Sequence, residues 1–173
     1  NKANIPENVN FIEMDICDER IIDVFERNKF EVVVHLAAQT MVNASIDDPI
    51  YDSDNNIRGT INILEACRKT GVRRIVFSST AAVYGDVNAV PVLEDFTTDP
   101  LSFYGLSKLT VEKYLKLYQK LYGLEYVILR YANVYGERQG DGGEGGVISI
   151  FMKLLAQNKA LTIHGDGKQS RDF

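Results

Sequence analysis

Short apolar runs alternate with amphipathic stretches along the whole chain. Runs rich in β-branched residues predict strands, and they lie at 9–14, 31–37, 73–79 and 125–132. Three of these runs are almost continuously apolar, which is typical of strands covered on both faces of a parallel sheet.

The stretches between the strands have helical periodicity. Helices are predicted at about 19–28, 49–70, 104–122 and 147–158. Asp48 and Pro49 form a typical start for the second of these helices, and Gly71 follows its end. Strand–helix alternation of this kind predicts an α/β fold, a doubly wound parallel sheet with right-handed crossovers.

Composition narrows the class of protein. The 173 residues suffice for one domain with a proper core, and the net charge of −5 gives no basic footprint for nucleic acid. No apolar run has the length of a membrane span. Cys17 and Cys67, fifty residues apart, favour a reduced, cytoplasmic setting and no metal site. The first and last residues of the chain are typical of an internal piece of a longer protein.

A glycine-rich stretch at 140–146 contains a literal G-x-G-x-x-G, formed by Gly140, Gly142 and Gly145. A dinucleotide fingerprint must join the end of a strand directly to a helix, and here the preceding strand ends near residue 132. Two acidic residues within the stretch would also repel phosphates. We therefore interpret it as a surface loop.

Polar residues that could take part in catalysis or ligand binding occur at two places in the sequence. Ser78, Ser79 and Thr80 follow a buried strand at the edge where open α/β sheets bind ligands. Tyr104 and Lys108 share a helix face, because positions i and i+4 are neighbours on a helix. Hydroxyls that close a strand end and an exposed Tyr–Lys pair are the structural alternatives.

Two further segments fit the same edge of the sheet. Asn56 and Gly59 lie inside a predicted helix although both have low helix propensity. Residues 35–38, His-Leu-Ala-Ala, end a strand in small side chains that leave room for a flat ligand. Close packing at Gly59 and a tight strand–loop junction would give the same pattern.

Taken together, these residues resemble the extended short-chain dehydrogenase/reductase superfamily and its NAD-dependent epimerase/dehydratase family. The resemblance runs through the whole chain and implies a Rossmann-like fold. It also implies a catalytic set formed by Thr80, Tyr104 and Lys108, with Asn56 as a fourth member. The implied NAD-binding residues are Asp15, Ile16, Leu36, Ala37, Ala38, Gln39, Asn56, Ser78, Ser79, Tyr104, Lys108 and Tyr131. The implied substrate-binding residues are Thr80, Tyr104, Asn133, Val147 and Arg171.

Within that family the chain looks most like the UDP-sugar 4-epimerases. Related dehydratases carry an acidic pair after the catalytic Thr, whereas this chain has Ala81 and Ala82. The epimerase resemblance implies that UDP-glucose and UDP-galactose interconvert through a 4-keto sugar. UDP-N-acetylhexosamine and uronate epimerases, decarboxylases, dehydratases and a non-catalytic NAD-binding module are the alternatives.

The chemistry depends on the phenol of Tyr104, whose ordinary pKa of about 10 is too high for a base near neutrality. An ammonium group at Lys108 favours the phenolate, and the positively charged nicotinamide would add to this effect. A reduction of about three pKa units requires roughly 4 kcal/mol. The Tyr104→Phe substitution should therefore abolish turnover.

The resemblance also shows which parts of the family's fold this sequence lacks. It has no glycine-rich βαβ unit and little of the C-terminal substrate lobe, so we expect residues 1–145 to be a partial NAD-binding domain and 146–173 the start of that lobe. Alone, such a piece should be inactive. The family also implies a homodimer through helices 49–70 and 104–122. Apolar residues that exceed the needs of one sheet face fit this interface, namely Tyr114, Leu117, Tyr118, Leu121 and Tyr122.

Overall fold

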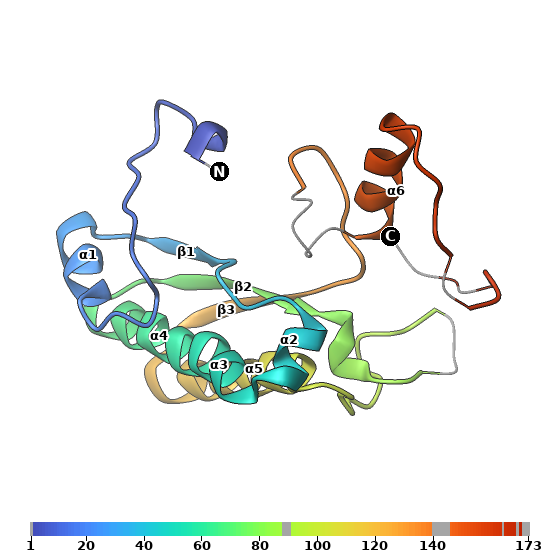
Figure 1. Ribbon diagram of the computed structural model, residues 1–173. Helices are drawn as coiled ribbons and strands as arrows, with labels where there is room; N and C mark the ends of the chain where they lie inside the picture. Colours follow the sequence, from blue (N-terminus) through green and yellow to red (C-terminus); the bar gives the residue numbers. More distant parts are fainter. Residues whose placement is uncertain (1, 88–90, 140–145, 164, 169, 171–173) are drawn as a thin grey trace. The chain divides into compact units, whose positions relative to one another are not determined.

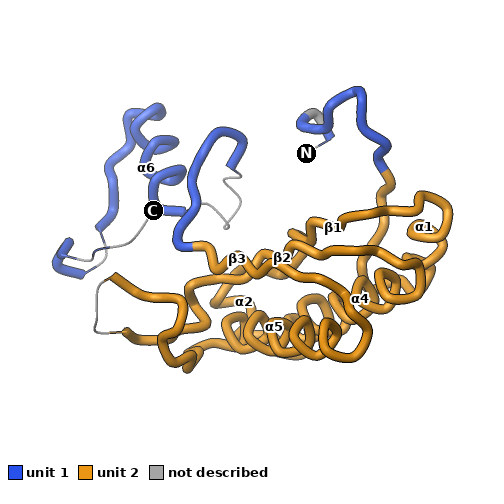
Figure 2. Tube along the Cα trace, turned by 180° about the vertical axis from the view of Figure 1, so that it is seen from behind, with its two compact units in different colours: residues 1–11, 132–173 blue, residues 12–131 orange. Residues whose placement is uncertain are grey.

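The computed structural model describes residues 2–87, 91–139, 146–163, 165–168 and 170. The chain forms two compact units, residues 12–131 and residues 1–11 with 132–173 (Figure 2). The glycine-rich stretch at 140–145 and the predicted substrate residue Arg171 lie outside the described residues. Each unit is described by itself below.

The larger unit contains a three-stranded parallel sheet with strand order β1-β2-β3. Its strands are β1 (Val32–His35), β2 (Arg74–Thr80) and β3 (Glu125–Tyr131). Val34 pairs with Val76, and Thr80 pairs with Tyr131 at the carboxyl end of the sheet. Three of the four predicted strands and the parallel α/β fold are thereby confirmed.

The predicted strand at 9–14 is wrong. This segment has no regular secondary structure in the structure, and Val9, Phe11 and Ile12 are about half exposed. A strand needs backbone partners along its edge, and β1, β2 and β3 are the only strands paired within the described residues. The apolar pattern is present, but within the described residues no neighbouring strand pairs with the backbone of this segment.

Helices form where the periodicity predicted them. They are α1 (Ile21–Asn28), α3 (Pro49–Ser53) continuing through a π-helical turn (Asp54–Arg58) into α4 (Gly59–Thr70), and α5 (Phe103–Tyr122). The smaller unit carries α6 (Val147–Ala156) and a 3₁₀ turn (Lys2–Asn4). Helix α2 (Val42–Asp47) and a 3₁₀ turn (Ala81–Tyr84) were not predicted.

The ends of the long helices follow from local chemistry. The Asp48 carboxylate accepts a hydrogen bond from the Tyr51 amide at 2.9 Å, which caps α3 one residue before Pro49. Ser102 caps α5 in the same way through the Gly105 amide. Gly71 ends α4 with a left-handed φ of 76°, a conformation that glycine adopts without strain.

One face of the sheet carries the core. Helices α3, α4 and α5 lie below the sheet in Figure 1, and α4 and α5 bury Leu64, Cys67 and Leu115 against Ile75 and Phe77 of β2. Side chains of the strands that point to the other face, such as Val34 at 60%, stay exposed. The larger unit therefore covers only one of the two sheet faces that the apolar runs led us to expect.

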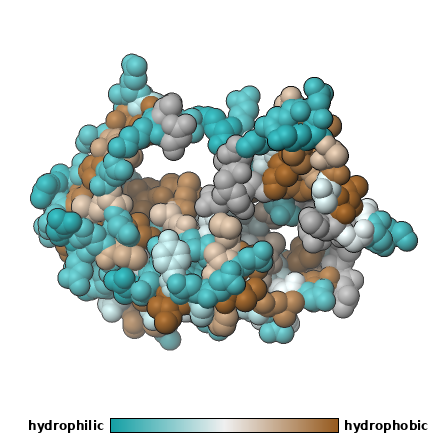
Figure 3. All heavy atoms as spheres, in the orientation of Figure 1, coloured by the Kyte–Doolittle hydropathy of each residue, from teal (hydrophilic) through white to brown (hydrophobic). Residues whose placement is uncertain are grey.

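Apolar side chains also reach the surface on the helix layer, where brown atoms appear along the lower edge of Figure 3. Leu117, Leu121 and Tyr122 of α5 are about half exposed. Tyr118, in contrast, is buried in the core and its hydroxyl donates to Glu65 at 2.8 Å. No helix among the described residues has the length and hydropathy that crossing a membrane requires.

Candidate active site

Two elements meet at the carboxyl edge of the sheet and bring Thr80 and Tyr104 together. Strand β2 ends at Thr80, whose hydroxyl accepts a hydrogen bond from the Ala82 amide at 3.1 Å. Tyr104 lies in the first turn of α5, with its phenol close enough to the Thr80 hydroxyl for that group to lower the pKa of the phenol. Burial raises the pKa of Tyr104 above its usual value, and the nearby Thr80 hydroxyl offsets part of this rise.

Close approach at this corner depends on Gly105. A Cβ atom at residue 105 would lie 2.8 Å from the Ala82 carbonyl oxygen and 3.0 Å from the Cβ of Pro100. Any larger side chain would push the start of α5 away from the turn that follows Thr80. Gly105 therefore allows the start of α5 to approach the turn that follows Thr80.

Lys108 lies one helical turn after Tyr104 and is 3% exposed. Its ammonium group donates to the Ser78 carbonyl oxygen at 2.9 Å. It also lies 5.0 Å from the Phe77 ring centroid and 5.9 Å from that of Tyr104, within cation–π range of both rings. Burial lowers the pKa of Lys108 to about 8, while the charge of Asp52 acts in the opposite direction.

Asn56 lies in the π-helical turn and is 2% exposed. Its side-chain oxygen Oδ1 accepts a hydrogen bond from the Gln39 backbone amide at 2.9 Å. Its side-chain nitrogen Nδ2 donates to the Gln39 backbone carbonyl oxygen at 3.0 Å. The same nitrogen lies 3.1 Å from the Ser107 hydroxyl, which in turn donates to the Tyr104 carbonyl oxygen. Asn56 thus connects the loop after β1 to the first turn of α5.

The π-helical turn explains why a residue of low helix propensity is found here. In this turn the Gly59 amide bonds the carbonyl oxygen of Asp54, five residues back, instead of the usual four. Such turns are frequent at functional sites. The side chain of Ile16 packs against Gly59 so closely that a Cβ there would lie 2.7 Å from it.

Asp52 is a member of this group that the sequence analysis did not identify. Its carboxylate is 1% exposed, and Oδ1 accepts from the Gln39 side-chain amide at 2.8 Å and from Asn56 at 3.0 Å. Its position four residues before Asn56 on a predicted helix was the available signal, because such residues share a face.

His35 is a second buried group that was not identified. Its ring nitrogen Nε2 lies 2.9 Å from the Thr60 hydroxyl, which donates to the Asn56 carbonyl oxygen. Burial, and then the charge of Lys108, lower the pKa of His35 to about 4. The imidazole is therefore neutral at physiological pH and supports the π-helical turn from the sheet side, through Thr60.

The predicted residues Ser78 and Ser79 contribute in different ways. Ser78 offers its backbone carbonyl oxygen to Lys108. The Ser79 hydroxyl instead donates to the buried carboxylate of Glu112 at 2.6 Å, and Arg130 pairs with the same carboxylate at 2.7 Å. Ser79 thus belongs to a buried ion-pair network that holds β2, β3 and α5 together.

The predicted cofactor residues lie in two places, at the carboxyl ends of the strands and in the loop before α1. Leu36 and Ala37 are exposed directly after β1, and Tyr131 pairs with Thr80 at the end of β3. Asp15 is exposed, and its carboxylate accepts from the Cys17 amide at 2.8 Å. Ile16 is tied to α4, since its carbonyl oxygen accepts from Asn62. Ala38 and Gln39 are partly buried in the loop that Asn56 holds.

These groups fit a nicotinamide dinucleotide. The small side chains at 37–38 leave the backbone reachable for a flat ring. The Lys108 ammonium group has three donors, and Ser78 accepts from one of them, so it can also bind ribose hydroxyls. The exposed Asp15 carboxylate suits an amino or hydroxyl group. Of the predicted substrate residues, Asn133 and Val147 belong to the smaller unit, with Val147 at the start of α6.

Comparison with characterised proteins identifies relatives along the full chain. A family model described as "NAD dependent epimerase/dehydratase family" matches residues 1–173. A protein of Methanocaldococcus jannaschii is 51% identical over 174 residues, which cover 100% of this chain and 57% of that protein. The UDP-glucose 4-epimerase of Mycolicibacterium smegmatis is 41% identical over 94% of this chain and 52% of its own length. The chain therefore spans about half the length of these curated relatives.

Solved structures agree with this result. The UDP-glucose 4-epimerase of Thermotoga maritima, solved with UDP-glucose, is 40% identical with a TM-score of 0.95 over 98% of this chain and 56% of its own. The Thermus thermophilus UDP-glucose 4-epimerase, solved with NAD, is 39% identical with a TM-score of 0.89 over 93% and 53%. A UDP-N-acetylglucosamine 4-epimerase of Methanobrevibacter ruminantium is 36% identical with a TM-score of 0.91 over 96% and 54%. This chain belongs to the NAD-dependent epimerase/dehydratase family.

Proposed function

We propose that the intact protein containing this chain is a UDP-sugar 4-epimerase that interconverts UDP-glucose and UDP-galactose. The observation that carries the proposal is the convergence of Thr80, at the carboxyl end of β2, with Tyr104 in the first turn of α5 and the buried Lys108 ammonium group one turn along that helix. This arrangement supplies a proton acceptor, a hydroxyl to guide the proton and a positive charge to stabilise the phenolate.

Tyr104 is the proposed base that takes the proton of the sugar hydroxyl. Burial in the protein raises the pKa of Tyr104, so the phenolate needs positive charge in addition to the effect of the Thr80 hydroxyl. Lys108 supplies one such charge from the same helix face, in a site where burial strengthens electrostatic interactions. Thr80 orients the sugar hydroxyl towards the phenolate oxygen, and the Asn56–Ser107 hydrogen bonds hold the first turn of α5 in place.

NAD, when bound, supplies the hydride acceptor for C4 of the sugar and the positive charge of the nicotinamide. The chain's own residues then handle the proton alone. Tyr104 would hold the proton while the 4-keto sugar turns over, and would return it to the C4 oxygen as the hydroxyl forms again. The reaction is redox-neutral, so NAD should remain with the protein between turnovers.

The substrate assignment is supported by what the site does not carry. Ala81 and Ala82 occupy the turn after Thr80, where water elimination would need an acid and a base. We therefore favour epimerisation over dehydration. We propose that Asn133, Val147 and Arg171 bind the sugar diphosphate, with the Arg171 guanidinium suited to charge-assisted bonds with phosphate oxygens.

The decisive experiment uses the intact protein without added cofactor. We expect acid denaturation to release NAD, and we expect the protein to interconvert UDP-glucose and UDP-galactose. Tyr104→Phe should abolish this activity while leaving NAD bound. The matched control, Tyr122→Phe, removes the same hydroxyl from an exposed position on the same helix and should retain activity. Normal turnover by Tyr104→Phe would refute the mechanism.

A panel of UDP-sugars tests the rival substrates. The relatives include an enzyme named for UDP-N-acetylglucosamine, so a preference for N-acetylated sugars would redirect the proposal within the same chemistry. A protein that binds NAD but converts no UDP-sugar would instead support a non-catalytic module. The presence of both Tyr104 and Lys108 favours the enzyme.

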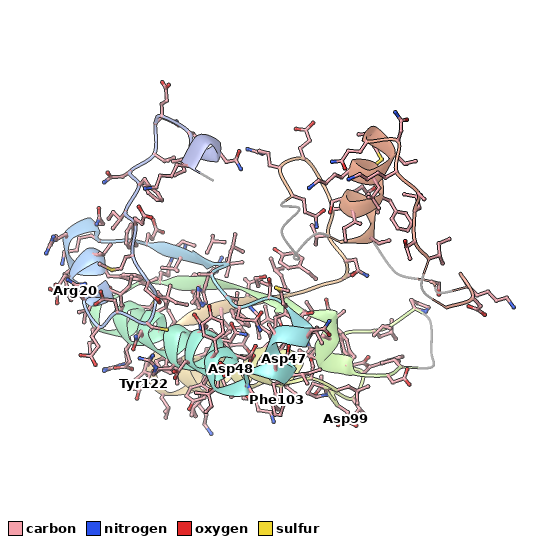
Figure 4. All side chains as sticks on the ribbon, in the orientation of Figure 1. Arg20, Asp47, Asp48, Asp99, Phe103 and Tyr122 are labelled. Carbon is pink, nitrogen blue, oxygen red and sulfur yellow. The ribbon has the colours of Figure 1, made fainter. Side chains whose placement is uncertain are left out.

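We also propose that the intact protein is a homodimer through the helix layer. Ile50 and Tyr51 of α3 and Leu117 and Leu121 of α5 present exposed apolar side chains on this layer. Phe103 and Tyr122, at the two ends of α5, lie on the same side in Figure 4. A monomeric mass at micromolar concentration would contradict the dimer. A cytoplasmic location remains a proposal, and the free thiols of Cys17 and Cys67 fit it.

A further inference from the structure

Three charged side chains of the larger unit are almost fully buried, and only one of them has an ionic partner at hydrogen-bond distance. Glu112, at 1% exposed, forms a bidentate pair with Arg130. The other two described residues of this kind are Asp52, at 1%, and Lys108, at 3%. They carry opposite charges and lie on α3 and α5, two helices in contact.

Asp52 is fixed in place by neutral donors. Both of its side-chain hydrogen bonds, from the Gln39 and Asn56 amides, go to Oδ1. Among the described residues, Oδ2 of Asp52 is the buried side-chain oxygen that has no hydrogen-bond partner. Burying a carboxylate with half of its acceptor capacity unused costs several kcal/mol unless a nearby positive charge compensates it.

Lys108, in turn, is a buried cation with no negatively charged partner at hydrogen-bond distance among the described residues. Its ammonium group donates to one backbone carbonyl oxygen and lies against the Phe77 ring. Burial without a counter-charge drives a lysine towards the neutral amine, which would be useless for stabilising a phenolate. The group therefore needs a negative charge held at a fixed distance.

The other titratable groups around Lys108 do not provide that charge. Tyr104 on its own helix is a protonated phenol, and His35 from β1 is a neutral imidazole. Glu112, one turn further along α5, is already paired with Arg130. Strand β2 contributes only the Ser78 carbonyl oxygen and the Phe77 ring. Asp52 remains, and its charge acts on both Lys108 and Tyr104.

We propose that Asp52 is a positioning residue of this site, whose buried carboxylate, oriented by Gln39 and Asn56, is the counter-charge that keeps Lys108 in the ammonium form beside Tyr104. This inference deepens the proposed function and rests on it for the role of the Tyr104–Lys108 pair in catalysis. It assigns to the π-helical region an electrostatic role in addition to the placing of Asn56. Lys108 would then be held as a cation by a fixed negative charge on α3, beside the phenol that it activates.

The test measures the ionisation of Lys108 directly in the intact protein, freed of nucleotide. Lysine labelled with ¹³C at the ε-carbon reports protonation by NMR, and the Lys108 resonance is the one missing from the Lys108→Met protein. We expect Asp52→Asn to lower the titration midpoint of Lys108 by about one pH unit or more, as an opposite charge near a buried group would. Asp52→Glu should restore part of the shift.

Asp52→Asn suits this test because an amide keeps the oxygen that Gln39 and Asn56 bind. The matched control, Asp47→Asn, removes the same charge from an exposed position at the end of α2 (Figure 4) and should leave the midpoint unchanged. An equal midpoint in wild type and Asp52→Asn would overturn the inference, and so would an equal shift in the control.

The wild-type protein provides the same test without a variant, should Asp52→Asn not fold. The ¹³Cγ resonance of Asp52 should show an inflection at the midpoint of Lys108, and its absence would overturn the inference.

A kinetic arm separates this result from the proposed function. If the protein is an epimerase, loss of the negative charge should move both limbs of the pH–rate profile to lower pH. A Lys108 shift without epimerase activity would refute only the function, whereas activity without the shift would refute only the role of Asp52.

Discussion

The burial of Lys108 predicts that the charged form needed for catalysis destabilises the folded protein, and that this cost can be measured as a pH dependence of stability. Burial lowers its pKa from 10.5 to about 8, which corresponds to about 3 kcal/mol of unfavourable free energy in the folded ammonium form. Between these two pH values the unfolded chain binds the proton and the folded protein does not. The free energy of unfolding should therefore rise with pH across this window, by about 3 kcal/mol.

The Lys108→Met substitution removes this dependence. Methionine fills a similar volume without a charge, so its contribution does not change between pH 8 and pH 10.5. At neutral pH the variant avoids the cost of burying an ammonium group but loses the hydrogen bond to Ser78, worth about 1.5–3 kcal/mol. We expect the variant to be as stable as wild type, or slightly more stable, at neutral pH. As the pH rises, its free energy of unfolding should fall by about 3 kcal/mol relative to that of wild type.

Urea unfolding of the nucleotide-free intact protein, followed by circular dichroism at a series of pH values, measures this difference. Other lysines and tyrosines titrate in both proteins and cancel in the comparison. Lys116→Met, at an exposed position on the same helix, is the control and should leave the curve parallel to wild type. Parallel curves for Lys108→Met and wild type would refute the reasoning, because they would mean that Lys108 is not a destabilised buried cation.

Three further substitutions test other parts of the site. His35→Gln should remove an acid-sensitive contribution, because the pKa of His35 is lowered from 6.5 to about 4 and wild type should lose about 3 kcal/mol of unfolding free energy as the pH falls through that range. Glu112→Gln should cost about 3–5 kcal/mol in urea unfolding, because it leaves the Arg130 charge without its buried partner. Gly105→Ala should lower kcat by up to about 100-fold, because the new Cβ would meet the Ala82 carbonyl oxygen at 2.8 Å and move Tyr104.

Each of these three predictions has a control or an outcome that would contradict it. Equal acid sensitivity of His35→Gln and wild type would show that the imidazole is not buried in its neutral form. Glu31→Gln, which loosens an exposed pair with Arg73, should cost no more than about 1 kcal/mol, and an equal cost would argue against the buried network. Gly136→Ala, with no atom within 4 Å of the new Cβ, is the control for Gly105→Ala.

Local patterns were sufficient for much of this fold. The Asp48–Pro49 start and the Gly71 end of one long helix depend on chemistry within a few residues, and both were found from sequence. The segment 9–14 has an equally good strand pattern, but a strand also requires a neighbour, which its own residues do not encode. Helix α2 was missed because six residues are too few to establish a period.

The candidate site was predictable only where its residues carry a recognisable spacing. Tyr104 and Lys108 stand four residues apart and were found, whereas Asp52 and Lys108 lie on two different helices, and their common burial is visible only in the structure. Tyr118 shows the same limit. Its place on α5 resembled that of its exposed neighbours, but contact with Glu65 draws it into the core.

The π-helical turn at Asp54–Arg58 also separates two orientations within one continuous helix. Successive residues of a helix are rotated by about 100°, so the extra residue in this turn sets the direction of α3 independently of the face that α4 buries against the sheet. Deleting Arg58, an exposed residue at the end of the turn, would keep Asp52 and Asn56 four residues apart, yet it would rotate both by about 100° relative to the face that α4 buries. The electrostatics of the site could thus be lost through a change of helical phase, without loss of any of its side chains.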